Sequence, residues 1–161
     1  MANMTFDEIV EELEKTVKWE FDGNESEFET NLLEHIEEIR LALALPPIEA
    51  VGRQKQIRLS DDSQIIMDIV VRHTDDTATI FEVKKYNNKH PHTGTVNQVQ
   101  AIGQLLLYAS VFEAQTGIRP RLVLADNKIF KRTLYVFSET KLPITLLELQ
   151  KDRLFIPYVG W

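Results

Sequence analysis

The sequence predicts a single α/β domain in which a mixed β-sheet is flanked by helices. Segments with apolar residues at helical spacing lie on both sides of segments rich in β-branched residues. The resulting order is helix, helix, three strands, helix, strand, strand, which contains an αβββαβ core. No internal repeat, low-complexity tract or linker divides residues 1–161, so we expect one domain that begins with acidic helices.

The composition is that of a globular protein large enough to bury a core. The chain has 161 residues, of which 43% are hydrophobic and 27% charged. It has no cysteine, which excludes disulfides, thiolate metal sites and cysteine nucleophiles. No apolar run reaches the roughly 18 residues that a membrane span needs, and the acidic N-terminus is unlike a signal peptide. We therefore expect a cytoplasmic protein with no membrane partner.

Two helices are predicted before the first strand. Residues 4–19 form an amphipathic pattern, with Thr5 as N-cap and Glu8 completing a capping box. After a turn at 21–24, residues 25–43 continue with apolar side chains at helical spacing, and Pro46 and Pro47 end this second helix. Its apolar positions are Phe28, Leu32, Leu33, Ile36, Ile39 and Leu43.

Three strands are predicted next, over residues 51–59, 65–72 and 77–84. The second and third are rich in branched side chains, and polar turns at 60–63 and 73–76 separate the three. A polar loop follows at 86–94, and His90 and His92 in it are expected to flank the site rather than to bind metal. His35 and His73 are expected to be ordinary helix-surface and turn residues.

The second half of the chain predicts one long helix and further short elements. Residues 95–116 form the helix, which Gly117 ends. Strands are expected at 121–125 and 132–137, and the tail from 141 as a short helix followed by an extended end. The side chains expected to point inward from the long helix are Val99, Ile102, Leu105, Leu106, Ala109 and Phe112.

Three charged residues interrupt the apolar strands. Glu82 and Lys84 share one face of the third strand because side chains alternate, and Asp68 lies in the strand before it. Partly buried charges cost several kcal/mol each unless they are paired or bind a metal, so this arrangement indicates a function. Two carboxylates suit Mg²⁺, the carbonyl of Val83 is a further oxygen ligand, and the lysine can orient or deprotonate water.

The spacing D-x13-E-x-K, followed by a helix, resembles the PD-(D/E)XK nuclease superfamily. The resemblance covers residues 25–125 and implies a restriction-endonuclease-like core. It implies that Asp68 and Glu82 bind a divalent cation, Mg²⁺ or Mn²⁺, and that Lys84 assists the nucleophile. The proline that often precedes the aspartate is replaced here by Met67.

Two further motifs resemble branches of that superfamily. Gln104 and Tyr108 form Q-x-x-x-Y in the long helix, as in RecB-like nucleases, and this implies that they support the lysine and the substrate backbone. The stretch ESEFETNLLEHI resembles the first helix of NucS-like endonuclease domains, where a glutamate joins the metal site. We choose Glu29 over Glu25 for that role, with Glu34 third.

Other glutamines near these motifs receive weaker predictions. Gln54 resembles a glutamine that recurs before the aspartate in the NucS-like group, without a role that the sequence defines. Gln98 and Gln100 precede the Q-x-x-x-Y motif and are expected near the substrate.

The charge distribution permits a nucleic-acid partner. Residues 1–50 carry a net charge of −11 and the remainder +4, which gives −7 in total. We expect nucleic acid, in the first place DNA, as the substrate, and a homodimer for cleavage of both strands of a duplex. A partner protein that supplies targeting is a further expectation, in a phage, defence or repair setting. The candidate phosphate contacts are Lys85, Lys89, Arg119, Arg121, Lys131 and Arg132.

Each motif has an ordinary explanation when taken alone. Glu-x-Lys is typical of an exposed edge strand, and Gln104 with Tyr108 of a polar helix flank. The nuclease interpretation depends on the three motifs occurring together, in order, on strand, strand and helix. A catalytically inactive nuclease-fold module that binds nucleic acid or a protein is the alternative, and a small-molecule metalloenzyme is a third.

Overall fold

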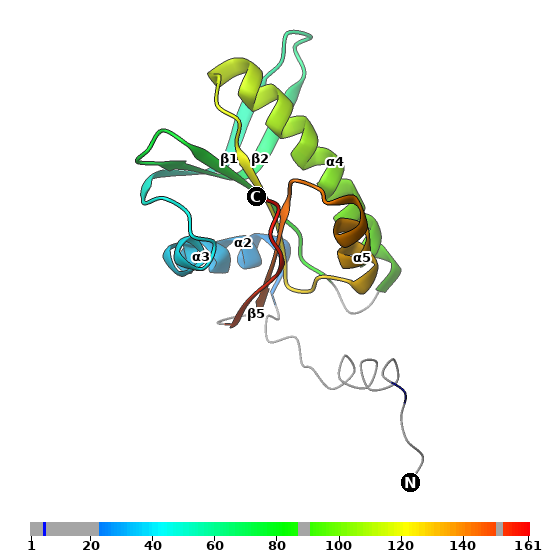
Figure 1. Cartoon of the computed structure of the whole chain (residues 1–161). Helices are drawn as coiled ribbons and strands as arrows, with labels where there is room; N and C mark the ends of the chain where they lie inside the picture. Colours follow the sequence, from blue (N-terminus) through cyan, green and yellow to red (C-terminus); the bar gives the residue numbers. More distant parts are fainter. Residues whose placement is uncertain (1–4, 6–22, 87–90, 151–152) are drawn as a thin grey trace.

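A computed structural model describes residues 5, 23–86, 91–150 and 153–161. In these ranges a six-stranded mixed sheet lies between two layers of helices (Figure 1). The strands stand in chain order in the sheet: β1 (Ile48–Arg58), β2 (Gln64–His73), β3 (Ala78–Val83), β4 (Arg121–Asp126), β5 (Thr145–Gln150) and β6 (Arg153–Tyr158). β3, β4 and β5 are parallel, and the remaining pairs are antiparallel. The predicted α/β class with a mixed central sheet is confirmed.

Four helices cover the sheet within the described ranges: α2 (Glu25–Glu34), α3 (Ile36–Ala42), α4 (Pro91–Thr116) and α5 (Lys131–Thr140). Asn24 caps α2, because its side chain accepts a hydrogen bond from the Glu27 amide at 2.8 Å. The helix predicted over 25–43 is divided at His35 into α2 and α3. The helix predicted over 4–19 lies outside the described residues. No described helix is both long and apolar enough to cross a membrane.

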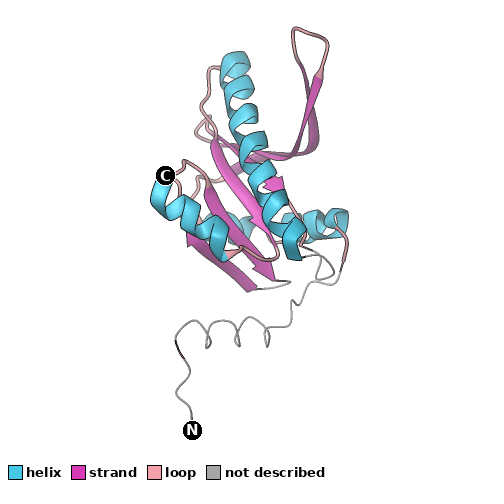
Figure 2. Cartoon of the chain, turned by 90° about the vertical axis from the view of Figure 1, so that its right-hand side faces the viewer, coloured by secondary structure: helices cyan, strands magenta, loops and turns pink. Residues whose placement is uncertain are grey.

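Each face of the sheet has its own core. Alternation along β3 directs Phe81 and Val83 toward α2 and α3, and Ile80 toward α4 and α5. Figure 2 shows the helices on their two sides of the sheet and the β1–β2 hairpin extending past it. The far end of this hairpin, including Ile65 and Met67, packs with α4. The sheet therefore joins two cores, and residues on its strands can reach either layer.

Two predictions for the second half of the chain are wrong. Residues predicted as a strand at 132–137 belong to helix α5, in which Thr133 and Phe137, one helical turn apart, are buried. The branched and aromatic residues of this segment fit both the alternation of a strand and the spacing of a helix, and tertiary packing selects the helix. The short helix predicted at the start of the tail is strand β5, whereas the extended end predicted after it is present as β6. β5 is almost wholly buried, so its continuous apolar run reads like a helix.

The inward face of α4 also differs from the prediction. Leu105 is buried as expected, and Ile102, Ala109 and Phe112 pack at its margin. Val99 and Leu106 point to solvent, since Ala101, Leu105 and Tyr108 form the stripe that meets the sheet. A straight helix presents only one stripe to the sheet, and the apolar residues of α4 exceed what one stripe holds.

Gly94 lets the start of α4 approach two aromatic rings, Tyr86 and Phe130, which pack edge to face at 4.9 Å. A Cβ at this position would lie 2.7 Å from Cδ2 of Tyr86 and would also overlap the ring of Phe130. Gly94→Ala should therefore lower the free energy of unfolding by about 1–3 kcal/mol, as overpacking does.

Denaturant unfolding would measure this change. Gly52→Ala is the matched control, because a Cβ there meets its nearest atoms at 3.9 Å and should change stability little. Equal stability of the two variants would contradict the close packing at Gly94.

Candidate active site

The structure brings Asp68, Glu82 and Lys84 together where β2 and β3 lie side by side. The β2–β3 register pairs Ile69 with Phe81, which sets Asp68 opposite Glu82. Oδ2 of Asp68 accepts a hydrogen bond from the Val83 amide at 2.8 Å, so the backbone of β3 holds this carboxylate. Nζ of Lys84 lies 3.3 Å from Oε1 of Glu82. The two carboxylates and the amine thus form one charged cluster.

Glu82 is the most perturbed member of this cluster. Burial raises its pKa to about 8, and the neighbouring Asp68 carboxylate adds to the rise, while Lys84 opposes it. Its Oε1 meets Lys84, but Oε2 is buried and has no hydrogen-bond partner among the described residues. A buried carboxylate oxygen without a donor is costly, and a cation beside it would remove that cost.

Glu25, in the first turn of α2, reaches the same cluster. Burial raises the pKa of its carboxyl; the Lys84 ammonium lowers it, and the Asp68 carboxylate raises it further. The nearby backbone N–H of Lys85 also lowers the pKa. Glu25 therefore shares the electrostatic environment of the residues on β2 and β3, although it comes from the other side of the sheet.

Glu29, one turn later, is buried and already paired. Nε of Arg53 lies 2.7 Å from its Oε1, and Nε2 of Gln54 donates to Oε2 at 3.1 Å. Both oxygens of this carboxylate thus accept hydrogen bonds from side chains of β1, and the guanidinium of Arg53 already balances its charge. The geometry favours Glu25 over Glu29 as the glutamate that faces the cluster, whereas the sequence motif favoured Glu29.

Gln54 connects the two acidic groups. Its amide donates to Glu29 and also to Oδ1 of Asp68, the latter at 3.2 Å. The residue has φ of +52°, in the left-handed region, at the point where β1 faces Asp68. This gives the glutamine singled out in the sequence a role in orienting Asp68. A cavity of about 430 Å³ opens here, lined by Glu25, Ser26, Glu29, Arg53, Gln54 and Asp68.

The Q-x-x-x-Y helix faces the same carboxylates. Tyr108 is buried, and burial together with the Glu82 and Asp68 charges raises the pKa of its hydroxyl to about 12. The phenol therefore stays protonated, so its O–H can donate a hydrogen bond to these anions. Gln104 lies one turn earlier on α4, and its Oε1 is buried with no hydrogen-bond partner within the described ranges.

The donor set suits a hard divalent cation. Mg²⁺ is commonly held by one or two carboxylates and keeps several waters, and Asp68 and Glu82 supply two, one with an unpartnered oxygen. Among the described residues, no three His, Cys, Asp or Glu side chains are arranged as a complete metal site. A cation here would therefore be completed by water and by backbone carbonyls such as that of Val83.

The basic candidates divide into two groups. Arg121 pairs with Thr79, three strand positions before Glu82, or about 10 Å, and its guanidinium donates to Thr77. Arg119 precedes it, so both lie at the far end of the strands from the cluster. Lys131 and Arg132, at the start of α5, line a cavity of about 160 Å³ together with Thr95, Lys128 and Phe130.

The remaining residues that the sequence singled out either form hydrogen bonds within the protein or lie outside the described residues. Nζ of Lys85 donates to the Tyr86 carbonyl at 2.8 Å, while Lys89 and His90 lie outside the described residues. His73 is buried, not a turn residue as predicted, and its ring nitrogens lie 2.8 Å from the Pro46 carbonyl and from Oγ1 of Thr79. Burial lowers the pKa of this imidazole.

A buried polar network that the sequence did not indicate holds the chain just after Lys84. The Tyr86 amide donates to Asp126 at 3.0 Å and to Asn127 at 2.6 Å, both at the end of β4. Gln98, expected near the substrate, is buried here and donates to Asp126 at 3.0 Å, while Gln100 is exposed. The sequence signal for this network was Asp126 itself, an aspartate at the end of a buried strand that lies next to the strand with E-x-K.

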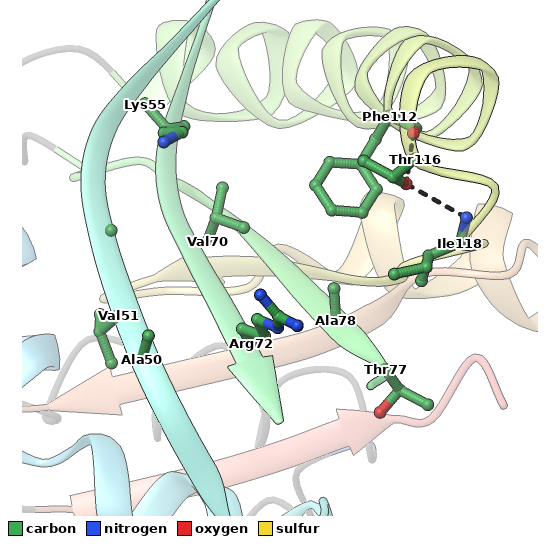
Figure 3. A pocket seen from close by; sticks show the side chains of 11 residues that line it. Ala50, Val51, Lys55, Val70, Arg72, Thr77, Ala78, Phe112, Thr116 and Ile118 are labelled. Atoms are coloured by element: carbon green, nitrogen blue, oxygen red, sulfur yellow. Dashed lines mark hydrogen bonds between the residues drawn. The ribbon is translucent and has the colours of Figure 1, made fainter. Parts of the chain in front are cut away.

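A larger cavity of about 520 Å³ lies apart from these carboxylates, between the first three strands and the end of α4 (Figure 3). Its lining is mainly apolar and includes Val70 and Phe112. Arg72 lies in it but is tied to Glu49 at 3.1 Å and to Asp76 at 3.4 Å. Since no carboxylate lines this cavity, it does not offer the predicted metal chemistry.

The architecture defines an endonuclease-like α/β fold. A similar solved structure is that of a repair endonuclease from Pyrococcus abyssi, with a TM-score of 0.50 and 19% sequence identity, over 82% of this chain and 50% of that chain. This chain thus spans half the length of that protein, and at this identity the likeness is one of fold. No family model matches the sequence, and no curated protein is significantly similar to it.

Asp126 should make the stability of the fold depend on pH. Burial raises the pKa of its carboxyl from 3.8 to about 7, with hydrogen bonds from Gln98 and Tyr86 opposing the rise. Between these pH values the folded chain keeps a proton that the unfolded chain releases. The contribution is complete below about pH 4 and is lost as the pH rises through 7.

Asp126→Asn should remove a slope of about 1.4 kcal/mol per pH unit from the unfolding free energy in this window. Denaturant titrations at several pH values, compared with the unaltered chain, measure it. Asp61→Asn is the control: Ser63 lowers the pKa of that exposed carboxyl below 3.8, so its substitution should leave the slope above pH 4 unchanged. Identical slopes in Asp126→Asn and the unaltered chain would mean that Asp126 is ionised in the fold.

Proposed function

We propose that this chain is a divalent-metal-dependent nuclease that hydrolyses phosphodiester bonds of nucleic acid, with DNA as the expected substrate. One observation carries the proposal: Asp68, Glu82 and Lys84 converge on neighbouring strands, and a buried oxygen of Glu82 has no partner in the described part of the chain. The fold shared with a protein described as a repair endonuclease supports it.

Asp68 and Glu82 are the proposed ligands of Mg²⁺ or Mn²⁺, with the Val83 carbonyl and Glu25 beside them. The cation would supply charge neutralisation at the phosphate and a more acidic water. Asp68 is held ready by the Val83 amide and by Gln54, so its orientation is set before any ligand arrives. The pKa of Glu82 is high because Lys84 does not fully offset burial and the Asp68 charge, and a bound cation would supply the missing positive charge.

Lys84 is the proposed partner of the attacking water. Its ammonium is 3.3 Å from Glu82 and mostly buried, so Lys84 is held next to the carboxylates. From there it can orient the water, accept its proton when neutral, and stabilise negative charge that develops on the phosphate. Tyr108 and Gln104 support this arrangement from α4, since the protonated phenol faces the same two carboxylates.

The substrate backbone is proposed to contact the basic residues at the start of α5. Lys131 and Arg132 are exposed and line one small cavity with Lys128. These positions follow the β4 end that anchors Tyr86, so they lie at the same end of the parallel strands as Glu82. Binding through such contacts weakens steeply as salt rises.

A catalytically inactive module of this fold is the second candidate. Its support is the acidity of residues 1–50, which repels a polyanion. A protein partner would tolerate this charge. Against it, the buried Glu82 and its neighbours cost several kcal/mol, which a module without chemistry has no physical reason to retain.

Cleavage of labelled DNA in Mg²⁺ or Mn²⁺ tests the proposed activity. Glu82→Gln and Lys84→Ala should each lower the rate by at least about 100-fold, because each removes a group that acts on the reacting atoms. Chelation should abolish cleavage in the unaltered chain. RNA and single-stranded DNA tested beside the duplex identify the substrate.

The control is Lys55→Ala, an exposed lysine on β1 in the cavity apart from the carboxylates, which should leave the rate unchanged. Cleavage that persists in both site variants would belong to another site or to a contaminant. Binding without cleavage in the unaltered chain, with either metal, would favour the inactive module.

Glu25 and Glu29 should separate function from stability. Glu25→Gln should lower cleavage by about 10-fold or more and leave the melting temperature unchanged or higher, because burial already disfavours its charge. Glu29→Gln should lower the melting temperature, since it leaves the buried pairing with Arg53 incomplete. Cleavage per folded molecule should change little in this variant. The reverse result would make Glu29 the functional glutamate.

A further inference from the structure

The outward face of α4 carries large apolar side chains that the described residues leave in solvent. Val96, Val99, Leu106 and Leu107 have exposed fractions of 54%, 59%, 41% and 49%. With spacings of three, seven and one residues, they lie on one side of the helix, opposite the stripe that meets the sheet. An exposed apolar surface of this kind marks an interaction site.

This face also has no charge before Glu113, which lies in the last turn of α4. From Thr93 to Phe112 the sequence contains no Asp, Glu, Lys or Arg, whereas about one residue in four is charged in the whole chain. The positions between the apolar side chains are Gln100, Gly103 and Ser110, all exposed. A helix that is apolar on both sides is typical of one buried on both sides, so α4 is built to be covered.

The pattern on this face is symmetric about Gly103. Val99 lies four residues before it and Leu107 four residues after it. Two copies of α4 that cross antiparallel at Gly103 would set Val99 of each copy against Leu107 of the other. A Cβ at Gly103 would meet nothing within 4 Å, so the helix surface is open at this point and a second helix can approach closely.

We propose that this face of α4 binds a second copy of the same chain in a two-fold dimer. Around a two-fold axis each residue near the axis meets its own copy, so a charged face would repel itself and an uncharged one does not. The net charge of −7 makes two copies repel one another overall, so an uncharged surface such as this face of α4 is the more suitable one for self-association. The charge pattern therefore selects a copy of this chain over an unlike, charged partner.

The dimer does not depend on the nuclease assignment, although the two are compatible. Tyr108 faces the carboxylates from α4, while Gly103 and Leu107 are exposed on the other side of the helix. Each carboxylate cluster would thus lie about one helix diameter, 10 Å, behind the interface. One particle would carry two such sites on opposite sides of the paired helices.

Sedimentation or light scattering on the full chain tests the proposal. The mass should be twice 18.6 kDa. Val99→Glu and Leu107→Glu should raise the dissociation constant by at least about 30-fold, because each places like charges in the contact. Leu41→Glu, at a position on α3 that is 64% exposed, is the matched control and should leave the dimer intact. Circular dichroism verifies that all three variants remain folded.

Cross-linking supplies a second, position-specific measurement. Because the chain has no cysteine, Gly103→Cys introduces one thiol near the proposed axis, and mild oxidation should yield a covalent dimer. Leu41→Cys should not cross-link at the same concentration. A chain that is monomeric at every concentration, or a dimer that both glutamate variants leave unchanged, would overturn the proposal. So would a monomer in which deletion of residues 1–22 exposes α4 to hydrogen exchange, which would assign the face to that segment.

Discussion

The site depends on three carboxylates and one ammonium held together in a partly buried space. Carboxylates that lie close together repel one another, and burial removes the water that would screen their charges. The high pKa of Glu82 expresses this conflict, and one of its oxygens has no partner in the described part of the chain, so Lys84 alone does not resolve it. A bound cation, as proposed, would resolve it. The same arrangement that costs stability in the free protein is thus what would give a metal ion its affinity.

Much of the fold around the cluster acts to keep these charges from separating. The Val83 amide and the amide of Gln54 hold Asp68, and the left-handed backbone of Gln54 directs its side chain between two acids. Arg53 neutralises Glu29, so one glutamate of α2 becomes structural and leaves Glu25 to face Lys84. Beyond β3, Asp126 and Asn127 fix the chain at Tyr86. The charged residues are therefore preorganised by hydrogen bonds from four strands and two helices.

Sequence reasoning succeeded where the pattern is local and failed where packing decides. The antiparallel strands β1 to β3 and the helix α4 follow from branched residues, turns and helical spacing, and the meeting of Asp68 with Glu82 follows from their register. The residues of α5 and β5 fit both periods, so only the sheet that surrounds them selects between helix and strand. The choice between Glu25 and Glu29 needed the position of Arg53, which lies 24 residues from Glu29 in sequence. The Asp126 network joins β4 to the segment after β3, and a local motif does not show that contact.

Helix α4 links the charged cluster to the proposed dimer, because one face of the helix contacts the site and the other is the proposed interface. Its inner face sets Tyr108 beside the carboxylates and Gln98 in the Asp126 network, so any shift of the helix changes both ends of the site. Its outer face has no charge between Thr93 and Phe112 and exposes apolar side chains, which favours a contact with a second helix. A helix clamped between the sheet and its own copy has little freedom to move. Dimerisation would therefore stabilise the position of Tyr108 and Gln104, and thereby couple assembly to the geometry of the charged cluster.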